Sequence, residues 1–355
     1  MISDIQLIIN LYKETKLKRP SILIIFFILI LAIVGFGGYK LLYVSNFETK
    51  KTVYVYIRQE RNFEDLCKQL VDSAGCIDIG GFKWGAKLLK YPDNMKTGRY
   101  AVEPGMDNIT LLNVLRRGQQ TATRITFNNI RLKSELVERL SEQLMINEED
   151  ILSLINNPDY CDSLGFTIET IPVLFIPNTY EIYWNIVANK LLQRMYHEYN
   201  TFWTDSRREK AQAINLTPIE IAILASIVEE ETAVADEYPV VAGLYLNRLK
   251  RDIPLQADPT VKFAVGDFSL QRVLYKYLEI ESPYNTYKYT GLPPGPIRIP
   301  SIRGIDGVLN YMQHNYLYMC AKDDFSGRHN FAVTLAEHNR NAERYRAELN
   351  RRRIW

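Results

Sequence analysis

The chain has few of the residues that metal and redox sites need. Its 355 residues include only four cysteines and four histidines. No two cysteines form a Cys-x-x-Cys pair, and no His-Glu-x-x-His sequence occurs. These absences argue against a zinc, thioredoxin-type or metalloprotease site, so we expect neither a metal ion nor a cofactor. Cys67 and Cys76 could form a disulfide in an oxidising compartment, and the sequence leaves this open.

The chain also lacks a strong net charge. Its 43 Lys and Arg residues nearly balance its 41 Asp and Glu residues, for a formal net charge of +2, so no basic field indicates nucleic acid as a partner. It has no internal repeat and no low-complexity tract. With 47% hydrophobic and 24% charged residues, the composition is that of a folded protein, and the length suits two soluble domains.

One long apolar run stands near the N-terminus. Residues 21–39 read SILIIFFILILAIVGFGGY without a charge, and about 20 apolar residues can span a bilayer. A cleaved signal peptide is the competing interpretation, but the apolar core is long and no small-x-small cleavage site follows it. Basic residues before the run favour a cytoplasmic N-terminus. We therefore predict a cytoplasmic tail at residues 1–20 and one transmembrane helix at 21–43. This places the protein in the inner (cytoplasmic) membrane, with the rest of the chain on the periplasmic or extracellular side.

The remaining residues divide into two predicted units, both with helices and strands. Residues 50–120 follow the order strand, helix, helix, strand, helix, which is more often found in a binding module than in an enzyme. The last of these helices, at 108–117, is stopped by Gly118. For residues 121–350 we predict a larger α+β unit. Its proline-rich stretch at about 254–297 contains aromatic and aliphatic residues and few charges, which favours an ordered cleft wall over disorder.

The helix predicted at residues 217–232, TPIEIAILASIVEEET, organises the larger unit. Thr217 can cap it, Pro218 suits the first helical position, and Glu220 lies three residues after the cap. Apolar residues then recur at helical spacing, and Glu231 lies on the same stripe. Burial beside that stripe would raise the pKa of Glu231 and keep a proton available for a leaving oxygen. The alternative is that three glutamates simply end a helix at the surface.

Six motifs in one order resemble the endolytic murein transglycosylase (YceG-like) family. They are ASIVEEET at 225–232, NRL at 247–249, LQADPT at 255–260, SPYNTY at 282–287, GLPPGPI at 291–297, and HNF with a following HN at 329–339. The resemblance covers about residues 52–345 and is weaker before 121. It implies an α+β fold with an N-terminal anchor, a small LysM-like subdomain at 50–120 and a catalytic domain at 121–350 with a central glutamate-bearing helix.

The same resemblance implies a lyase that cuts peptidoglycan glycan strands between N-acetylmuramic acid and N-acetylglucosamine. The glutamate of the family's Glu-x-Glu-Thr pattern corresponds here to Glu231, the residue that the helical spacing indicates. It would protonate the glycosidic oxygen and then take the proton from the 6-hydroxyl of the muramic sugar, leaving a 1,6-anhydro end. The implied partners are nascent glycan strands, the cytoplasmic membrane and cell-wall synthesis proteins, so the roles lie in cell wall biogenesis and degradation.

The predicted cleft loops carry further candidates for substrate binding. They are Gln256, Asp258, Asn285, Tyr284 and Tyr287. The polar side chains could bond sugar hydroxyls or an N-acetyl group, and the tyrosines could stack on sugar rings. For the polar residues the alternative is turn stabilisation, and for the tyrosines it is packing. In an earlier loop, Asn178 stands where the family often has Asp, which removes the charge at that position.

Two other functions remain open. A non-catalytic, membrane-anchored peptidoglycan-binding scaffold predicts that a Glu231→Gln protein behaves like the parent. A hydrolytic muramidase predicts reducing ends and usually needs a second carboxylate. Glu229 is poorly placed for that role, about 200° around the helix from Glu231. Asp258 is the first candidate instead.

Overall fold

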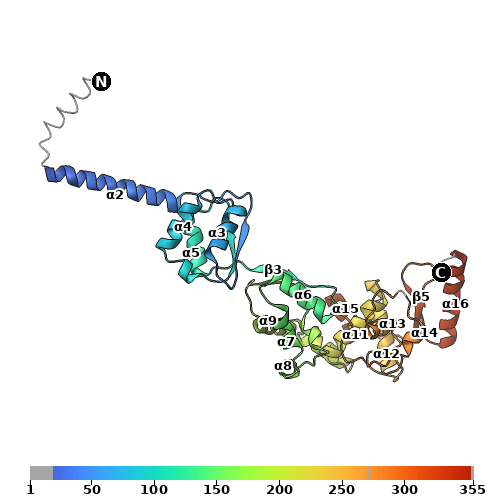
Figure 1. Ribbon diagram of the computed structural model, residues 1–355. Helices are drawn as coiled ribbons and strands as arrows, with labels where there is room; N and C mark the ends of the chain where they lie inside the picture. The colour runs from blue at the N-terminus through green and yellow to red at the C-terminus, as the bar shows by residue number, and fades with distance from the viewer. Residues whose placement is uncertain (1–18, 271, 353–355) are drawn as a thin grey trace. The chain divides into compact units, whose positions relative to one another are not determined.

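The computed structural model describes residues 19–270 and 272–352, which form two compact units (Figure 1). The first contains the described residues up to Thr123 together with Tyr183–Asn185, and the second contains the other described residues. The mixed α and β content is confirmed. The predicted tail at 1–20 lies outside the described residues, apart from Arg19 and Pro20, which begin the first described helix. The domain bounds at 50–120 and 121–350 stay a prediction.

The first described helix, α2 (Arg19–Tyr43), is the apolar one. Its segment Leu23–Tyr43 has a mean hydropathy of 2.3 and is long and apolar enough to cross a membrane. Among the described residues, α10 (Asp205–Ala213) and α11 (Pro218–Glu231) pass the same test only as a pair bent by 75°. Because α11 is buried inside its unit, α2 is the candidate anchor. A helix of this kind near an N-terminus also fits a signal sequence.

The first unit contains the predicted strand, helix, helix, strand, helix order. Strand β1 (Val53–Ile57) pairs antiparallel with β2 (Gly98–Val102), with Val55 opposite Tyr100. The helices are α3 (Phe63–Asp72), α4 (Ile79–Leu88) and α5 (Asn108–Arg117), with the 3₁₀ turn η1 (Pro92–Asn94) before β2. Gly118 adopts φ 69° and ends α5, as its position in the sequence predicts. The likeness to LysM stays a prediction.

The second unit is mostly helical. Its helices are α6 (Lys133–Gln143), α7 (Glu148–Ile155), α8 (Pro158–Ser163), α9 (Ala188–Phe202), α10, α11, α12 (Tyr238–Leu249), α13 (Asp258–Val265), α14 (Tyr275–Leu278), α15 (Ile302–Leu309) and α16 (Leu335–Arg352). Short 3₁₀ turns occur at η2 (Ile171–Leu174) and η3 (Ala235–Glu237). Strand β3 (Thr123–Thr126) pairs with β4 (Thr179–Ile182), and β5 (Tyr318–Ala321) pairs antiparallel with β6 (His329–Ala332).

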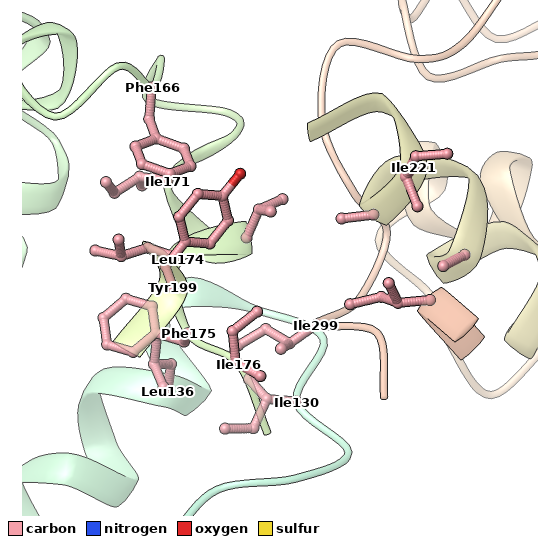
Figure 2. Close-up of a cluster of buried hydrophobic side chains, with 14 of the residues drawn as sticks. Ile130, Leu136, Phe166, Ile171, Leu174, Phe175, Ile176, Tyr199, Ile221 and Ile299 are labelled. Atoms are coloured by element: carbon pink, nitrogen blue, oxygen red, sulfur yellow. The ribbon is translucent and has the colours of Figure 1, made fainter. Parts of the chain in front are cut away.

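The core of this unit surrounds α11. Every residue from Ile221 to Glu229 is buried, because α10, α12, α13 and α15 all pack against the helix. The single apolar stripe predicted from the sequence is incomplete, because the middle of α11 has no exposed face. Figure 2 shows part of the core, where side chains from segments as distant as Ile130 and Ile299 meet. The Ile299 N–H donates to the Ile130 carbonyl at 2.8 Å, which joins these segments.

Two helices of the second unit differ from the sequence-based expectation. The proline-rich stretch was predicted as a cleft wall without a helix, but α13 begins within it at Asp258. Pro259 occupies the start of that helix, where its missing N–H costs nothing, so Asp-Pro here begins a helix and is not a turn. Helix α15 was not predicted, although Ser301 caps it by accepting from the Gly304 N–H at 3.0 Å.

Candidate active site

A pocket of about 350 Å³ opens at the C-terminal end of α11. It is lined by Glu231, Leu244, Tyr245, Arg248, Leu255, Gln256, Asp258, Tyr287, Leu317, Tyr318, Met319, Cys320, Ala321, His329 and His338. These residues come from α11, α12, α16, the start of α13, the β5–β6 hairpin and the loops between them. The structure thus brings Glu231, Gln256, Asp258 and Tyr287 to one cavity, while Asn285 and Tyr284 do not line it.

Local sequence signals fix where α11 begins and ends. Thr217 Oγ1 accepts from the Glu220 N–H at 3.2 Å, and Glu220 Oε2 accepts from the Thr217 N–H at 2.7 Å. This reciprocal capping box satisfies two helix-end donors and sets the first turn. At the other end Thr232 turns to an extended backbone, with φ −137° and ψ 132°. Glu231 is therefore the last residue of the helix, at the edge of the pocket.

The carboxyl group of Glu231 is partly buried and has one hydrogen-bond donor. Tyr245 Oη on α12 donates to Glu231 Oε1 at 2.8 Å. Burial is the largest influence and raises the pKa of Glu231 to about 7, helped by the nearby charge of Asp258 and opposed by the Tyr245 hydrogen bond. A carboxyl group with this pKa carries a proton in a large fraction of molecules near neutral pH. It can therefore both give and take a proton under those conditions.

The two preceding glutamates have different partners. Glu229 is buried and accepts hydrogen bonds from the Ser301 N–H and Oγ, with Arg298 Nε at 3.6 Å. Glu230 is paired with Arg131 at 2.7 Å and with Arg298 at 2.8 Å. Both carboxylates thus join α11 to other segments of the unit. The alternative that three glutamates merely end a helix at the surface does not fit these contacts, and only Glu231 lines the pocket.

Asp258 is the second acid among the lining residues. Its Oδ1 accepts a hydrogen bond of 2.6 Å from Tyr287 Oη. Burial, followed by the hydrogen bond to Asp258, raises the pKa of Tyr287, so this phenol keeps its proton and acts as a donor. The pair connects the first turn of α13 with the 282–287 loop. Both side chains remain on the cavity wall, where a sugar hydroxyl could reach them.

Gln256 and Arg248 build one wall of the pocket. Gln256 is a non-glycine residue with φ 54°, a strained left-handed conformation that its surroundings must maintain. Its N–H donates to the Thr286 carbonyl at 3.0 Å, and its side-chain oxygen accepts from Arg248 Nη2. Arg248 also donates to the carbonyls of Pro254 at 2.9 Å and Leu317 at 2.7 Å. The guanidinium thus bonds neutral oxygens and joins three segments.

Asn285 and Tyr284 shape the loop that presents Tyr287. Asn285 is fully buried, and its amide donates to the carbonyls of Leu278 at 2.9 Å and Ile280 at 3.0 Å. Its oxygen accepts from the Tyr287 N–H at 3.1 Å. The Tyr284 ring packs against Phe263, with centroids 4.7 Å apart. These contacts match the turn and packing alternatives for both residues.

One constellation beside the pocket was not found from the sequence. Glu237 is buried, its Oε2 accepts from Thr232 Oγ1 at 3.0 Å, and His329 Nδ1 lies 2.9 Å from the same oxygen. The His329 N–H donates to Glu237 Oε1 at 2.9 Å. Burial alone would raise the pKa of Glu237, but the hydrogen bonds from His329 and Thr232 outweigh it and hold that pKa below its ordinary value.

This network fixes the residue next to Glu231 and places the His329 ring on the pocket wall. No local signal reveals it, because His329 and Glu237 are 92 positions apart.

The remaining histidine and cysteine side chains form no metal centre. Burial, and then the charge of Arg248, lower the pKa of His338, whose Nδ1 has no hydrogen-bond partner among the described residues. In residues 19–270 and 272–352, no group of three or more His, Cys, Asp or Glu side chains is arranged to hold an ion. All four cysteines carry free thiols, and burial raises the pKa of Cys67 to about 11.

Comparisons with known proteins give one consistent result. The YceG-like family model matches residues 55–344. The endolytic murein transglycosylase of Bacillus subtilis (strain 168) is 27% identical over 333 residues, which cover 88% of this chain and 90% of that protein. The protein of the same name from Streptococcus pneumoniae (strain R6) is 28% identical over 370 residues, covering 92% of this chain and 66% of its own.

A solved structure is also similar. The crystal structure of a yceG-like protein from Listeria monocytogenes superposes with a TM-score of 0.52 at 25% sequence identity. The match covers 82% of this chain and 99% of that one.

Proposed function

The chain belongs to the YceG-like family, and from this premise we propose that it is an endolytic lytic transglycosylase of peptidoglycan. Its substrate is the glycan strand of peptidoglycan, because the relatives are named murein transglycosylases. We place the cut at the bond between N-acetylmuramic acid and N-acetylglucosamine. The observation that carries the proposal is the Glu231 carboxyl group, whose pKa is raised to about 7 by burial at the end of a pocket of about 350 Å³. Such a group is suited to serve first as an acid and then as a base.

In the first step, protonated Glu231 gives its proton to the glycosidic oxygen while the bond to the anomeric carbon of the muramic sugar breaks. The sugar takes on oxocarbenium character, and the chain beyond the broken bond leaves as an alcohol. Glu231 is now ionised, and the hydrogen bond from Tyr245 at 2.8 Å stabilises its negative charge. Tyr245 therefore lowers the free energy of the ionised form, while burial still keeps the pKa of Glu231 above its ordinary value.

In the second step, ionised Glu231 takes the proton from the 6-hydroxyl of the same muramic sugar. The oxygen of that hydroxyl attacks the anomeric carbon, and a 1,6-anhydro ring closes. No water is consumed, and Glu231 recovers its proton. One carboxyl group thus completes the cycle. The neighbouring Glu229 and Glu230 are not needed for it, and both are held in ion pairs within the unit.

The other lining residues bind and orient the strand in this proposal. Asp258 and Tyr287, joined by their 2.6 Å hydrogen bond, offer an acceptor and an aromatic surface to a sugar ring. The Gln256 side chain is held in place by Arg248 and offers its amide N–H groups to the cavity. Asn285 and Tyr284 support the loop and are not assigned a contact with substrate.

The same proposal includes membrane attachment. The apolar helix at Leu23–Tyr43 serves as a single-pass anchor in the cytoplasmic membrane, with the catalytic domain at 121–350 on the outer side, where peptidoglycan lies. Residues 50–120 act as a LysM-like module that contacts glycan. Basic residues preceding the apolar run support an N-terminus in the cytoplasm.

The test is glycan cleavage by the full-length protein and two glutamine variants of α11. Glu231→Gln keeps the size of the side chain but removes the titratable proton, so cleavage should stop. Glu220→Gln is the matched control, because it lies on the same helix, outside the pocket, and Gln also serves in a capping box. Its cleavage rate should equal that of the parent. A Glu231→Gln protein that cleaves normally would favour the non-catalytic scaffold function.

A further inference from the structure

The end of α2 is part of the first unit and is not a free tether. The last turns of α2 pack against α4 and α5 (Figure 1). A Cβ atom added to Gly85 would lie 2.7 Å from Leu42 Cδ2, and one added to Gly81 would lie 3.2 Å from Leu41 Cδ2. These two glycines, four residues apart on α4, therefore allow α2 and α4 to pack closely. Asn108 Nδ2, at the start of α5, donates to the Leu41 carbonyl at 2.7 Å.

This packing fixes the depth of α4 relative to a membrane that α2 would cross. The uncharged run begins at residue 21, and about 20 residues at 1.5 Å each cross the hydrocarbon core. The outer boundary then falls near residue 41, where α2 meets α4. The Trp84 ring of α4 reaches deeper still, because its Cη2 lies 3.9 Å from the Cβ position of Gly38, inside the apolar run.

The surface at this depth is apolar and aromatic. Trp84 is 46% exposed and Leu88 is 61% exposed, and the two lie four residues apart on one face of α4. The last turns of α2 add the exposed rings of Tyr39 and Tyr43, stacked with centroids 5.4 Å apart. Trp84, Leu88, Tyr39 and Tyr43 are together called the α4 face below. Trp and Tyr are the residues typical of a membrane–water interface.

Basic side chains accompany the α4 face. Lys40 follows Tyr39 on α2, and Lys87 precedes Leu88 on α4; both are exposed. Ammonium groups at this level match the charge of anionic lipid headgroups. The Lys87 side chain, in the last turn of α4, also has the sign that the helix C-terminus favours.

We propose that the α4 face docks on the outer surface of the same membrane that α2 crosses, with Trp84 and Leu88 in the boundary between headgroups and acyl chains. The occupant of this face is lipid, because the face is continuous with a helix whose own surroundings would be lipid. The inference rests on the proposed membrane anchor. Its consequence is that the first unit stays at the membrane surface and does not extend away on a flexible stalk.

The test uses tryptophan fluorescence of the full-length protein in liposomes that contain phosphatidylglycerol and lipids brominated at known depths. Bromine quenches only nearby tryptophan, and the difference between parent and Trp84→Phe isolates the Trp84 emission from that of the other three tryptophans. We expect bromines close to the headgroup to remove most of the Trp84 emission. We expect bromines near the acyl-chain ends to remove much less.

A matched control moves the probe to another exposed apolar site of the same unit. Val71 on α3 is 47% exposed and lies outside the α4 face. In the Trp84→Phe, Val71→Trp protein, aqueous iodide should quench the new tryptophan, and brominated lipid should leave it unchanged. If brominated lipid instead fails to quench Trp84 in the parent, the α4 face is in water or against protein, and the docking proposal is overturned.

Alkaline extraction distinguishes failure of the docking from failure of the anchor. A protein that stays in the membrane after alkali, with Trp84 quenched by iodide alone, contradicts the docking only. A protein that alkali removes contradicts the anchor, and the docking with it. Retention together with quenching by shallow bromines supports both.

Discussion

The phenol of Tyr245 donates a hydrogen bond of 2.8 Å to Oε1 of Glu231 across two packed helices. Burial raises the pKa of Glu231 to about 7, and this hydrogen bond acts in the opposite direction, because it favours the ionised form. The two influences leave the carboxyl group able to change its protonation state near neutral pH. A general acid that must later act as a base needs this balance.

The first prediction concerns Tyr245→Phe. The Tyr245 hydrogen bond lowers the pKa of Glu231, so removing this donor should let the pKa rise further. Activity needs the protonated acid and falls as pH rises through that pKa, so the alkaline limb of the pH–rate profile should move to higher pH. The ionised intermediate also loses a charge-assisted hydrogen bond, typically about 1.5–3 kcal/mol, so the rate at the optimum should fall by roughly 10-fold to 100-fold. An unchanged limb would contradict the role given to Tyr245.

The second prediction concerns Asp258→Asn. The negative charge of Asp258 contributes to the raised pKa of Glu231, so its removal should lower that pKa. The alkaline limb should then move to lower pH, opposite to the Tyr245→Phe shift. Asn keeps an acceptor for the Tyr287 hydroxyl, so the loop should stay in place. Measuring the cleavage rate across about pH 5–9, a window around the Glu231 pKa, would check the shift of the alkaline limb. Complete loss of activity would instead favour a hydrolase with two catalytic carboxylates.

The third prediction links Glu231, the proposed catalytic residue, to stability. The folded-state pKa of Glu231 is raised from 4.5 to about 7, so the native state binds more protons than the unfolded state between these values. The unfolding free energy should therefore decrease as pH rises from about 4.5 to about 7, by roughly 3 kcal/mol from this group, and stay lower above pH 7. Glu231→Gln should remove this loss. Denaturant unfolding should show the variant more stable than the parent at pH 8 and equal to it at pH 4, and a pH-independent difference would contradict the raised pKa.

The fourth prediction concerns the close contact between α15 and Glu229. A Cβ atom at Gly304 would overlap the Glu229 carboxylate, which is itself fixed by Ser301 and Arg298. Gly304→Ala should therefore lower the unfolding free energy by about 1–3 kcal/mol, as overpacking of a core usually does. Gly35→Ala is the control, because nothing lies within 4 Å of its added Cβ. A Gly304→Ala protein with the parent's denaturation midpoint would mean that Glu229 is free to move.

The sequence revealed those parts of the fold and site that depend on neighbouring residues. The cap at Thr217, the stop at Gly118 and the last helical position of Glu231 each follow from a few adjacent residues. For Asp258 the sequence left turn stabilisation open, because an Asp-Pro pair can begin either a turn or a helix. Only the packing of α13 against α11 decides between them.

Other parts of the site depend on contacts between distant residues. Tyr245 reaches Glu231 because α12 packs on α11, and His329 reaches Glu237 because the β5–β6 hairpin closes one side of the pocket. No local pattern in the sequence encodes these pairings. The resemblance to a family marked the residues of the motifs as candidates. Only the structure separated Tyr287, which lines the pocket, from Asn285, which supports the loop.

The most direct test of the account is the mass of the new glycan ends made by the full-length protein, compared with those of Glu231→Gln. Closure by the sugar's own 6-hydroxyl leaves each new end lighter by one water than a hydrolysed end. We predict anhydro ends from the parent and no new ends from Glu231→Gln. Reducing ends from the parent, or anhydro ends from Glu231→Gln, would contradict the proposal that Glu231 alone serves as acid and then as base.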